Sequence, residues 1–327
     1  MDFDLTEDQR EIKNVAREML TARSPWPRVR EAAEAGAYDE ALWREIVELG
    51  WPGIAVAEEH GGQGLGAVEL AVLLEELGYA CAATPFYSSA VAGAVIQAGG
   101  TAEQRARWLP GLVSGEVRAG VGTADLVVDG HGADVVILLD DDGARLIAGA
   151  ESEPLEAIDP TRRFATVRGD GEPLAGDVPH RVRAAMAAEV VGVCQRALEM
   201  TLEYVKDRKQ FGVPVGSFQA VSHRCAQMLM HTESVRSTAY YAAWAADAEP
   251  ARLGEASALA AAAAATAARE VAASAIQAHG GIGFTWEADV HWLYKRGEVD
   301  RALLGGARRH HAALARAAAQ RVAVPAP

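Results

Sequence analysis

The sequence predicts a mainly α-helical protein with a small β unit between two helical regions. Apolar residues recur at helical spacing over most of residues 5–113 and again from residue 180 to about residue 320. Between residues 117 and 177 this period is lost, and short apolar runs such as VVILL alternate with turn sequences such as HGAD and GDGE. Half of the 327 residues are hydrophobic and only 6% are aromatic. Alanine, the strongest helix former, fills long stretches.

The first region is expected to be a helical domain of residues 1–120. Its first helix follows Thr6, which together with Gln9 predicts a capping box. The second helix stops at Gly50, and a glycine-rich loop over residues 60–66 precedes the third. The expected helices cover residues 5–23, 39–49, 67–79, 86–98 and 102–113.

Residues 121–178 are expected to form a small β domain of about four to six short antiparallel strands. The remaining residues, 179–327, predict a bundle of long helices. Those helices are expected over residues 180–208, 217–247, 252–279 and 287–320.

Charge and composition exclude several functional classes. The net charge of −14 and the pI near 5.1 argue against nucleic acid, because binding its backbone needs a basic surface. A local pocket for an anionic ligand stays possible on an acidic protein. The longest apolar run, residues 256–268, is too short and too rich in alanine for a membrane span. We therefore expect no nucleic-acid partner and no membrane span.

Cysteine and histidine usage predicts neither disulfides nor a metal site. The three cysteines, Cys81, Cys194 and Cys225, are scattered without metal-ligand spacing, which suits a reducing cytoplasm. His310 and His311 are adjacent on an expected helix, where neighbours in sequence point apart. The expected location is the cytoplasm, with no bound metal.

Two helix ends carry motifs that invite a functional interpretation. The first is RKQFG, residues 208–212, and the second is IQAHGGIGF, residues 276–284. Each alone is explained by helix termination, because basic residues and glycine are common at helix C-termini. The second is not a dinucleotide fingerprint, since it lacks the preceding strand and a third glycine at the right offset. Together, an arginine fork and exposed backbone groups could bind a diphosphate.

With their surroundings, these motifs resemble the acyl-CoA dehydrogenase family. YVKDRKQFGVPVGSFQAVSHRCAQM and IQAHGGIGFTWEADVHWLYKR are similar to its C-terminal four-helix bundle. LGWPGIAVAEEHGGQGLGAVELAVLLEELGYACAATPF and RARWLPGLVSGE resemble its N-terminal helical domain. The resemblance covers residues 1–120 and 180–315. It implies FAD as cofactor, an acyl-CoA substrate and electron-transfer flavoprotein as acceptor.

The resemblance also assigns residues to a FAD site shared with a neighbouring subunit. Arg208 and Phe211 take the family's FAD-contacting positions, with Gln210 nearby. The other implied FAD contacts are Gln219 at the start of the next helix, and Gln277, Gly280 and Gly281 near the adenosine and diphosphate.

The sequence departs from the family in its β domain and at the catalytic base. The Thr-Glu-Pro, Gly-Ser-Asp and Trp-Ile-Thr-like segments that hold the flavin ring are missing from the shortened β domain. The usual position of the base, after the GGxGF motif, is Leu304. The alternative position precedes Arg183, 25 residues before Arg208, and is Val182. Neither side chain can accept a proton.

Glu189 is the nearest remaining carboxylate on the helix of Arg183 and is a candidate base. An ion pair with a neighbouring helix is the alternative interpretation of Glu189, and Arg183 itself could serve in a salt bridge.

The family motifs that are present, together with the ring-binding segments and the base that are missing, predict a short subunit of a heteromeric, α₂β₂-like acyl-CoA dehydrogenase. A full-length partner subunit would supply the base and the ring-binding loops, for a bulky or steroid-derived thioester. Two alternatives stay open. One is a homo-oligomer that uses an unusual base such as Glu189. The other is a scaffold subunit that binds no flavin.

Overall fold

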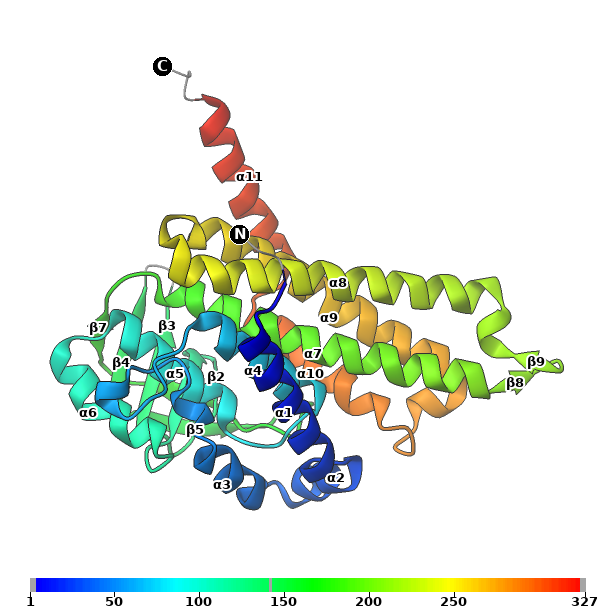
Figure 1. Cartoon of the computed structure of the whole chain (residues 1–327), viewed down its shortest axis with the longest axis horizontal. Helices are drawn as coiled ribbons and strands as arrows, with labels where there is room; N and C mark the ends of the chain where they lie inside the picture. The colour runs from blue at the N-terminus through cyan, green and yellow to red at the C-terminus, as the bar shows by residue number, and fades with distance from the viewer. Residues whose placement is uncertain (1–3, 141–142, 324–327) are drawn as a thin grey trace.

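The computed structural model describes residues 4–140 and 143–323 (Figure 1). A group of N-terminal helices is followed by a β-sheet and then by a bundle of long helices, as the sequence predicts. The N-terminal helices are α1 (Glu7–Arg23), α2 (Trp26–Ala35), α3 (Glu40–Glu48), α4 (Ala67–Tyr79), α5 (Phe86–Gly99) and α6 (Ala102–Val113). After the sheet come α7 (Val178–Asp207), α8 (Gln219–Ala248), α9 (Pro250–His279), α10 (Val290–Leu303) and α11 (Ala307–Ala323). The domain boundaries at residues 120 and 178 stay a prediction.

The start of α1 confirms the expected capping box, whereas α2 was not predicted. The Gln9 amide donates to the Thr6 hydroxyl at 3.2 Å, and the Thr6 amide donates to the Gln9 side chain at 2.9 Å. Pro25 is the N-cap of α2 and Pro27 lies in its first turn. At these positions a missing N–H costs no intrahelical bond, so prolines that suggest a break instead begin a helix.

The sheet differs from the sequence expectation in strand number and in one pairing. The described residues form seven strands in the order β5-β6-β2-β1-β3-β4-β7, where four to six antiparallel strands were expected. β1 and β3 run parallel, with Val121 opposite Ile137. β2 already pairs with one edge of β1. The chain therefore crosses to the other edge of β1, where β3 pairs with it in parallel. The strands are β1 (Ala119–Thr123), β2 (Leu126–Val128), β3 (Val135–Leu139), β4 (Ala144–Ala148), β5 (Glu151–Leu155), β6 (Phe164–Arg168) and β7 (Glu172–Leu174).

Helix α9 forms the centre of the bundle and packs against α7, α8, α10 and α11. Its alanine-rich face is buried, and small side chains let neighbouring helices approach closely. The segment Pro250–Phe284 is long and apolar enough to cross a membrane by composition, although the apolar run alone was expected to be too short. However, 61% of its most apolar window is buried inside the protein. The apolar character of α9 is accounted for by core packing.

The last predicted helix, residues 287–320, is two helices. Gly305 and Gly306 separate α10 from α11 with φ angles of 73° and 72°, a backbone region that favours glycine. As a result α11 takes a different direction from α10: it packs against α9, and its end projects beyond the body of the protein (Figure 1).

Candidate functional site

The first motif ends α7 and forms an exposed hairpin at one end of the bundle (Figure 1). Arg208 is the C-cap of α7, and β8 (Lys209–Gln210) and β9 (Val213–Pro214) follow. The Gln210 side chain donates to the Lys209 carbonyl at 2.9 Å. Phe211, at the turn, has a positive φ of 54° and is 93% exposed. A bulky residue in this conformation carries strain, which makes this ring a candidate for contact with another molecule.

The second motif ends α9 at the same end of the bundle. The rings of Tyr204 and His279 stack with centroids 4.5 Å apart, which joins the last turns of α7 and α9. Gln277 is exposed in the last turn of α9, and Gly280 follows with a φ of 64°. Gln219 begins α8 at this end too (Figure 1). Tertiary packing therefore brings together the positions that the resemblance assigns to FAD.

Several polar groups at this end of the bundle are unpaired. The Arg208 guanidinium makes no hydrogen bond or ion pair with the residues that the structure describes. Nor do the backbone N–H groups of Gln219 and Ala220 find an acceptor there. A Cβ atom at Gly280 or Gly281 would meet nothing within 4 Å, so open space adjoins this backbone. A cationic fork, free amides and accessible backbone fit the diphosphate of FAD.

An adjoining cavity extends this surface with residues that sequence reasoning did not single out. The cavity has a volume of about 570 Å³, and Gln277, Phe284, Trp286 and Lys295 line it. Phe284 is 73% exposed and Trp286 is 71% exposed. The Lys295 Nζ atom lies 3.9 Å from the Trp286 ring centroid, a cation–π arrangement. The sequence signal for this surface is two aromatic residues close together, Phe284 at the end of the glycine motif and Trp286 two residues later.

The two positions that the resemblance assigns to the base line one cavity, separate from the one beside the second motif. Val182 on α7 and Leu304 after α10 both line a cavity of about 450 Å³. They are 7% and 3% exposed, and neither side chain can take up a proton. Arg183, which the resemblance places 25 residues before Arg208, also lines this cavity. Neither position can therefore supply a general base.

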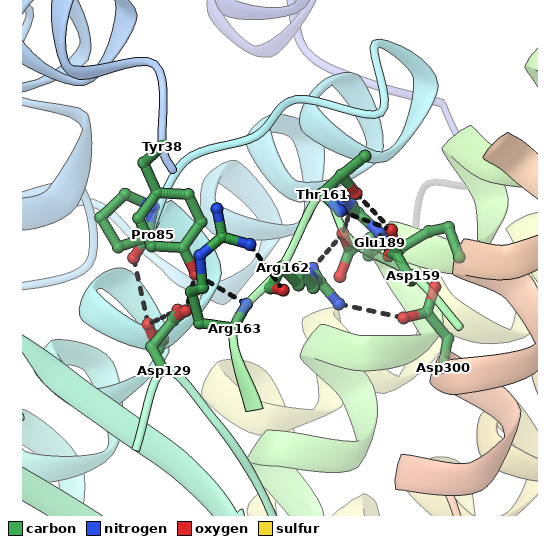
Figure 2. Close-up of polar contacts among 11 residues, drawn as sticks. Tyr38, Pro85, Asp129, Asp159, Thr161, Arg162, Arg163, Glu189 and Asp300 are labelled. Atoms are coloured by element: carbon green, nitrogen blue, oxygen red, sulfur yellow. Dashed lines mark hydrogen bonds and ion pairs between the residues drawn. The ribbon is translucent and has the colours of Figure 1, made fainter. Parts of the chain in front are cut away.

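Glu189 lies in a buried ion cluster and not among the residues that line this cavity (Figure 2). One of its oxygens accepts hydrogen bonds from Arg162 and, at 3.0 Å, from Arg296. Asp300 pairs with Arg162 at 3.0 Å, and Asp159 pairs with Arg296 at 2.6 Å. These contacts favour the ion-pair interpretation of Glu189.

Burial controls the charges in the cluster. Burial, together with the Glu189 carboxylate, raises the pKa of Asp300 well above its ordinary value. Burial alone would also raise the pKa of Asp159, but Arg296 and a hydrogen bond from Thr161 lower it. The cluster thus binds the loop before β6 to α7 and α10.

Known proteins are similar to this chain in sequence and in fold. The family Acyl-CoA dehydrogenase, C-terminal domain, matches residues 169–319, and Acyl-CoA dehydrogenase, N-terminal domain, matches residues 6–116. The chain is 34% identical to Acyl-CoA dehydrogenase IpdE2 of Mycobacterium tuberculosis over 295 residues, which span 87% of this chain and 89% of the relative. It is 32% identical to the IpdE2 of Mycolicibacterium smegmatis, over 92% of this chain and 96% of that protein.

Two solved structures share the fold over nearly the whole chain. A variant of the Tcur3481-Tcur3483 steroid ACAD superposes with a TM-score of 0.86 at 30% identity, covering 97% of this chain and 99% of that one. A chain of the ChsE4-ChsE5 complex from Mycobacterium tuberculosis superposes with a TM-score of 0.85 at 26% identity, covering 100% of both. With the bundle, the sheet and the two matched domains, these likenesses establish that the chain belongs to the acyl-CoA dehydrogenase family of FAD-dependent oxidoreductases.

Proposed function

We propose that this chain is the short subunit of a heteromeric acyl-CoA dehydrogenase that introduces an α,β double bond into an acyl-CoA thioester. The observation that carries the proposal is the cavity at Val182 and Leu304, where both positions of the base are aliphatic. Removal of an α proton needs a carboxylate opposite the acyl group. A full-length partner subunit supplies this base, the loops around the flavin ring and most of the acyl-CoA pocket.

The contribution of this chain is a clamp on the diphosphate of a FAD bound mainly by the partner. When bound, FAD accepts the hydride that leaves the β carbon of the thioester. Arg208 pairs with the diphosphate, and the free N–H groups at the start of α8 donate to it. Gly280 and Gly281 allow close approach because no side chain fills the space beside them. The clamp also includes Gln210, Phe211, Gln219 and Gln277.

The exposed aromatic residues near the clamp support association with a partner subunit. Phe211, Phe284 and Trp286 expose large apolar surfaces, and burying them on association is favourable. The names of the two solved relatives, ChsE4-ChsE5 and Tcur3481-Tcur3483, each join two components, which supports an α₂β₂-like assembly. The word "steroid" in one name supports a bulky, steroid-derived thioester.

The electron acceptor and the location complete the proposal. Electron-transfer flavoprotein is the acceptor that the family resemblance implies. The three cysteines, Cys81, Cys194 and Cys225, are buried free thiols, which suits a cytoplasmic enzyme.

The two alternative functions give different roles to Glu189 and Arg208. A homo-oligomer would need an unusual base such as Glu189, but one carboxylate oxygen of Glu189 is held by both Arg162 and Arg296. A scaffold without flavin would leave the unpaired groups around Arg208 without a role. The heteromeric enzyme accounts for both observations.

Flavin content and native mass test the proposal directly. The chain would be purified alone and after co-expression with a full-length member of the family. We expect a colourless chain alone, and about one FAD for each heterodimer in the pair, since one clamp serves one partner site. Stoichiometric FAD on the chain alone, or a pair that assembles without FAD, contradicts the proposed role. The first result favours the homo-oligomer and the second favours the scaffold.

A further inference from the structure

The exposed face of α11 carries basic side chains that have no partner. Arg308, Arg309 and Arg316 are exposed and make no hydrogen bond or ion pair with residues 4–140 and 143–323. The helix contains no acidic residue. Arg308 and Arg309 lie in its first turn, where the helix dipole favours anions and disfavours cations. The start of α11 is therefore electrostatically unfavourable unless an acidic group from elsewhere lies beside it.

Helix α1 presents the complementary pattern of charge. Glu11 and Glu18 are exposed and have no ion-pair or hydrogen-bond partner in the part of the chain that the structure describes. In contrast, Lys13 and Arg17 of the same helix pair with buried carboxylates on α4. Helix α1 thus directs these cations toward α4 and leaves unpaired carboxylates on its outer face.

The charges on the two helices have the same spacing. Glu11 and Glu18 are seven residues apart, and so are Arg309 and Arg316. Seven residues make about two turns, so each pair lies on one face of its helix and spans roughly 10.5 Å along the axis. In an antiparallel arrangement, Glu18 lies opposite Arg309 and Glu11 lies opposite Arg316. This direction also places the C-terminal end of α1 beside the N-terminal end of α11, which the helix dipoles favour.

The side chains between the charges fit the same register. Val15 lies three residues before Glu18, and Ala312 lies three residues after Arg309, so the antiparallel register places Val15 opposite Ala312. Val15 is 43% exposed, which is unusual for a large apolar side chain, and Ala312 is small and exposed. Burying Val15 against Ala312 is favourable, and the small alanine lets the two helices approach closely.

These two faces do not meet within one chain. Helix α1 packs against α4, whereas α11 packs against α9, and they lie on separate parts of the molecule (Figure 1). The end of α11 projects beyond the body of the protein, where another molecule can reach it (Figure 1). A second copy of this chain carries the matching acidic face.

We propose that two copies of this chain associate through these faces, with α11 of each copy lying antiparallel on α1 of the other. A two-fold axis forms the contact twice and closes the assembly. The repetition matters, because one contact of a few helical turns buries less area than a stable interface needs. This association goes beyond the proposed function and uses no residue of the flavin clamp.

Sedimentation of the chain purified alone tests the association. We expect a monomer–dimer equilibrium that depends on salt, because the ion pairs are exposed and salt screens them. Raising the NaCl concentration from about 50 mM to about 500 mM should increase the dissociation constant of the dimer at least about tenfold.

Charge reversal connects the dimer to the two faces. The double change Glu11→Lys with Glu18→Lys should raise the dissociation constant at least about tenfold, because attraction becomes repulsion in both symmetric contacts. Adding Arg309→Glu and Arg316→Glu to the same chain should restore the affinity, since every opposed pair again has opposite charges.

Glu34→Lys with Glu48→Lys is the matched control. Both carboxylates are exposed, lie outside α1 and have no partner among the described residues. This variant changes the net charge by the same amount and should dimerise like the parent. It therefore separates pairing at the two faces from a general effect of net charge.

A cross-link tests the register. The native cysteines are buried, so Val15→Cys with Ala312→Cys adds the only exposed thiols of the described chain. Under mild oxidation we expect a disulfide-linked dimer, and neither single variant should join position 15 to position 312 of another copy.

Four results would overturn the inference. They are a monomer at every salt concentration, a dimer that the Glu11 and Glu18 reversals leave intact, an equal loss in the control, and no recovery in the combined variant. After co-expression, cross-linking of position 312 to a full-length subunit in place of this chain would also contradict it. All the sedimentation measurements use the chain without FAD, so this test and the flavin test fail independently.

Discussion

Val182 in α7 and Leu304 at the end of α10 line the same cavity, although they lie far apart in the sequence. The family resemblance assigns the base to one or the other of these positions, and each side chain is aliphatic. Neither position therefore compensates for the missing carboxylate of the other. Under the proposed function the base comes from another chain, and the experiments below follow from that proposal.

Replacing Arg208 with alanine should weaken FAD binding to the assembled enzyme. Arg208 is exposed and its guanidinium has no partner among residues 4–140 and 143–323, so its removal leaves no buried group there unsatisfied. A lost charge-assisted bond to a phosphate weakens affinity by about tenfold to a hundredfold. Flavin absorbance per complex and a FAD titration of the stripped complex measure the effect.

Lys206→Ala is the control for that variant, because Lys206 is an exposed cation in the last turn of α7. It should leave FAD affinity unchanged. A complex that keeps its full FAD affinity after Arg208→Ala would show that Arg208 is not part of the clamp.

Glu189→Gln should leave turnover per bound FAD within about twofold of the parent enzyme, since a residue held by two arginines does not act as the base. The melting temperature should fall, because the amide pairs less well with Arg162 and Arg296. Steady-state rates normalised to flavin, together with thermal unfolding, separate these two effects. Abolished turnover in a folded, flavin-loaded complex would instead identify Glu189 as the base.

Arg296→Met should reduce the free energy of unfolding by about 3–5 kcal/mol. Arg296 is 1% exposed, and its removal leaves the buried Asp159 without its ion-pair partner and Glu189 with Arg162 alone. Urea unfolding of the chain measures this loss. Arg321→Met is the matched control: its ion pair with Glu255 is mostly exposed, and removing it should cost less than about 1 kcal/mol. Equal losses in the two variants would contradict the structural role of the cluster.

Asp129 should make stability fall as the pH rises. Its carboxyl group accepts hydrogen bonds from Tyr38 and Ser88 (Figure 2 labels Tyr38 and Asp129). Burial raises the pKa of Asp129 from 3.8 to about 8, although Arg162 and Arg163 oppose this. Between these values the folded protein keeps a proton that the unfolded chain has released. The stability that the folded protein gains from this proton is fully present below pH 3.8. It is lost as the pH rises toward 8.

Asp129→Asn removes this titration, and asparagine tolerates the positive φ of 58° at this position. Relative to the parent, the variant should gain up to about 1.4 kcal/mol of stability per pH unit across the window. Urea unfolding at several pH values between 5 and 8 measures the difference. Asp125→Asn, an exposed change on the β1–β2 hairpin, should leave the parent profile unaltered. Parallel profiles for the parent and Asp129→Asn would contradict the raised pKa.

Local signals in the sequence predicted most of the helices and the clamp motifs. Hydrophobic period and the capping pair Thr6 and Gln9 identified α1, and the glycine motif located the end of α9. The two aliphatic base positions were also readable, because a missing carboxylate is a property of single residues. Where local signals conflicted, as at Pro25 and Pro27, prediction missed a helix.

From the sequence alone we predict the family, most of the long helices, the residues proposed for the clamp, and aliphatic side chains at the two expected positions of the base, Val182 and Leu304. The parallel pairing of β1 with β3, the ion pairs of Glu189 and the shared cavity become visible only in the folded chain. The difference lies in how far apart in the sequence the interacting residues are. Helical period and capping depend on residues within one or two turns, whereas a strand's neighbour, or the arginine that pairs with a buried carboxylate, is chosen by packing between distant segments.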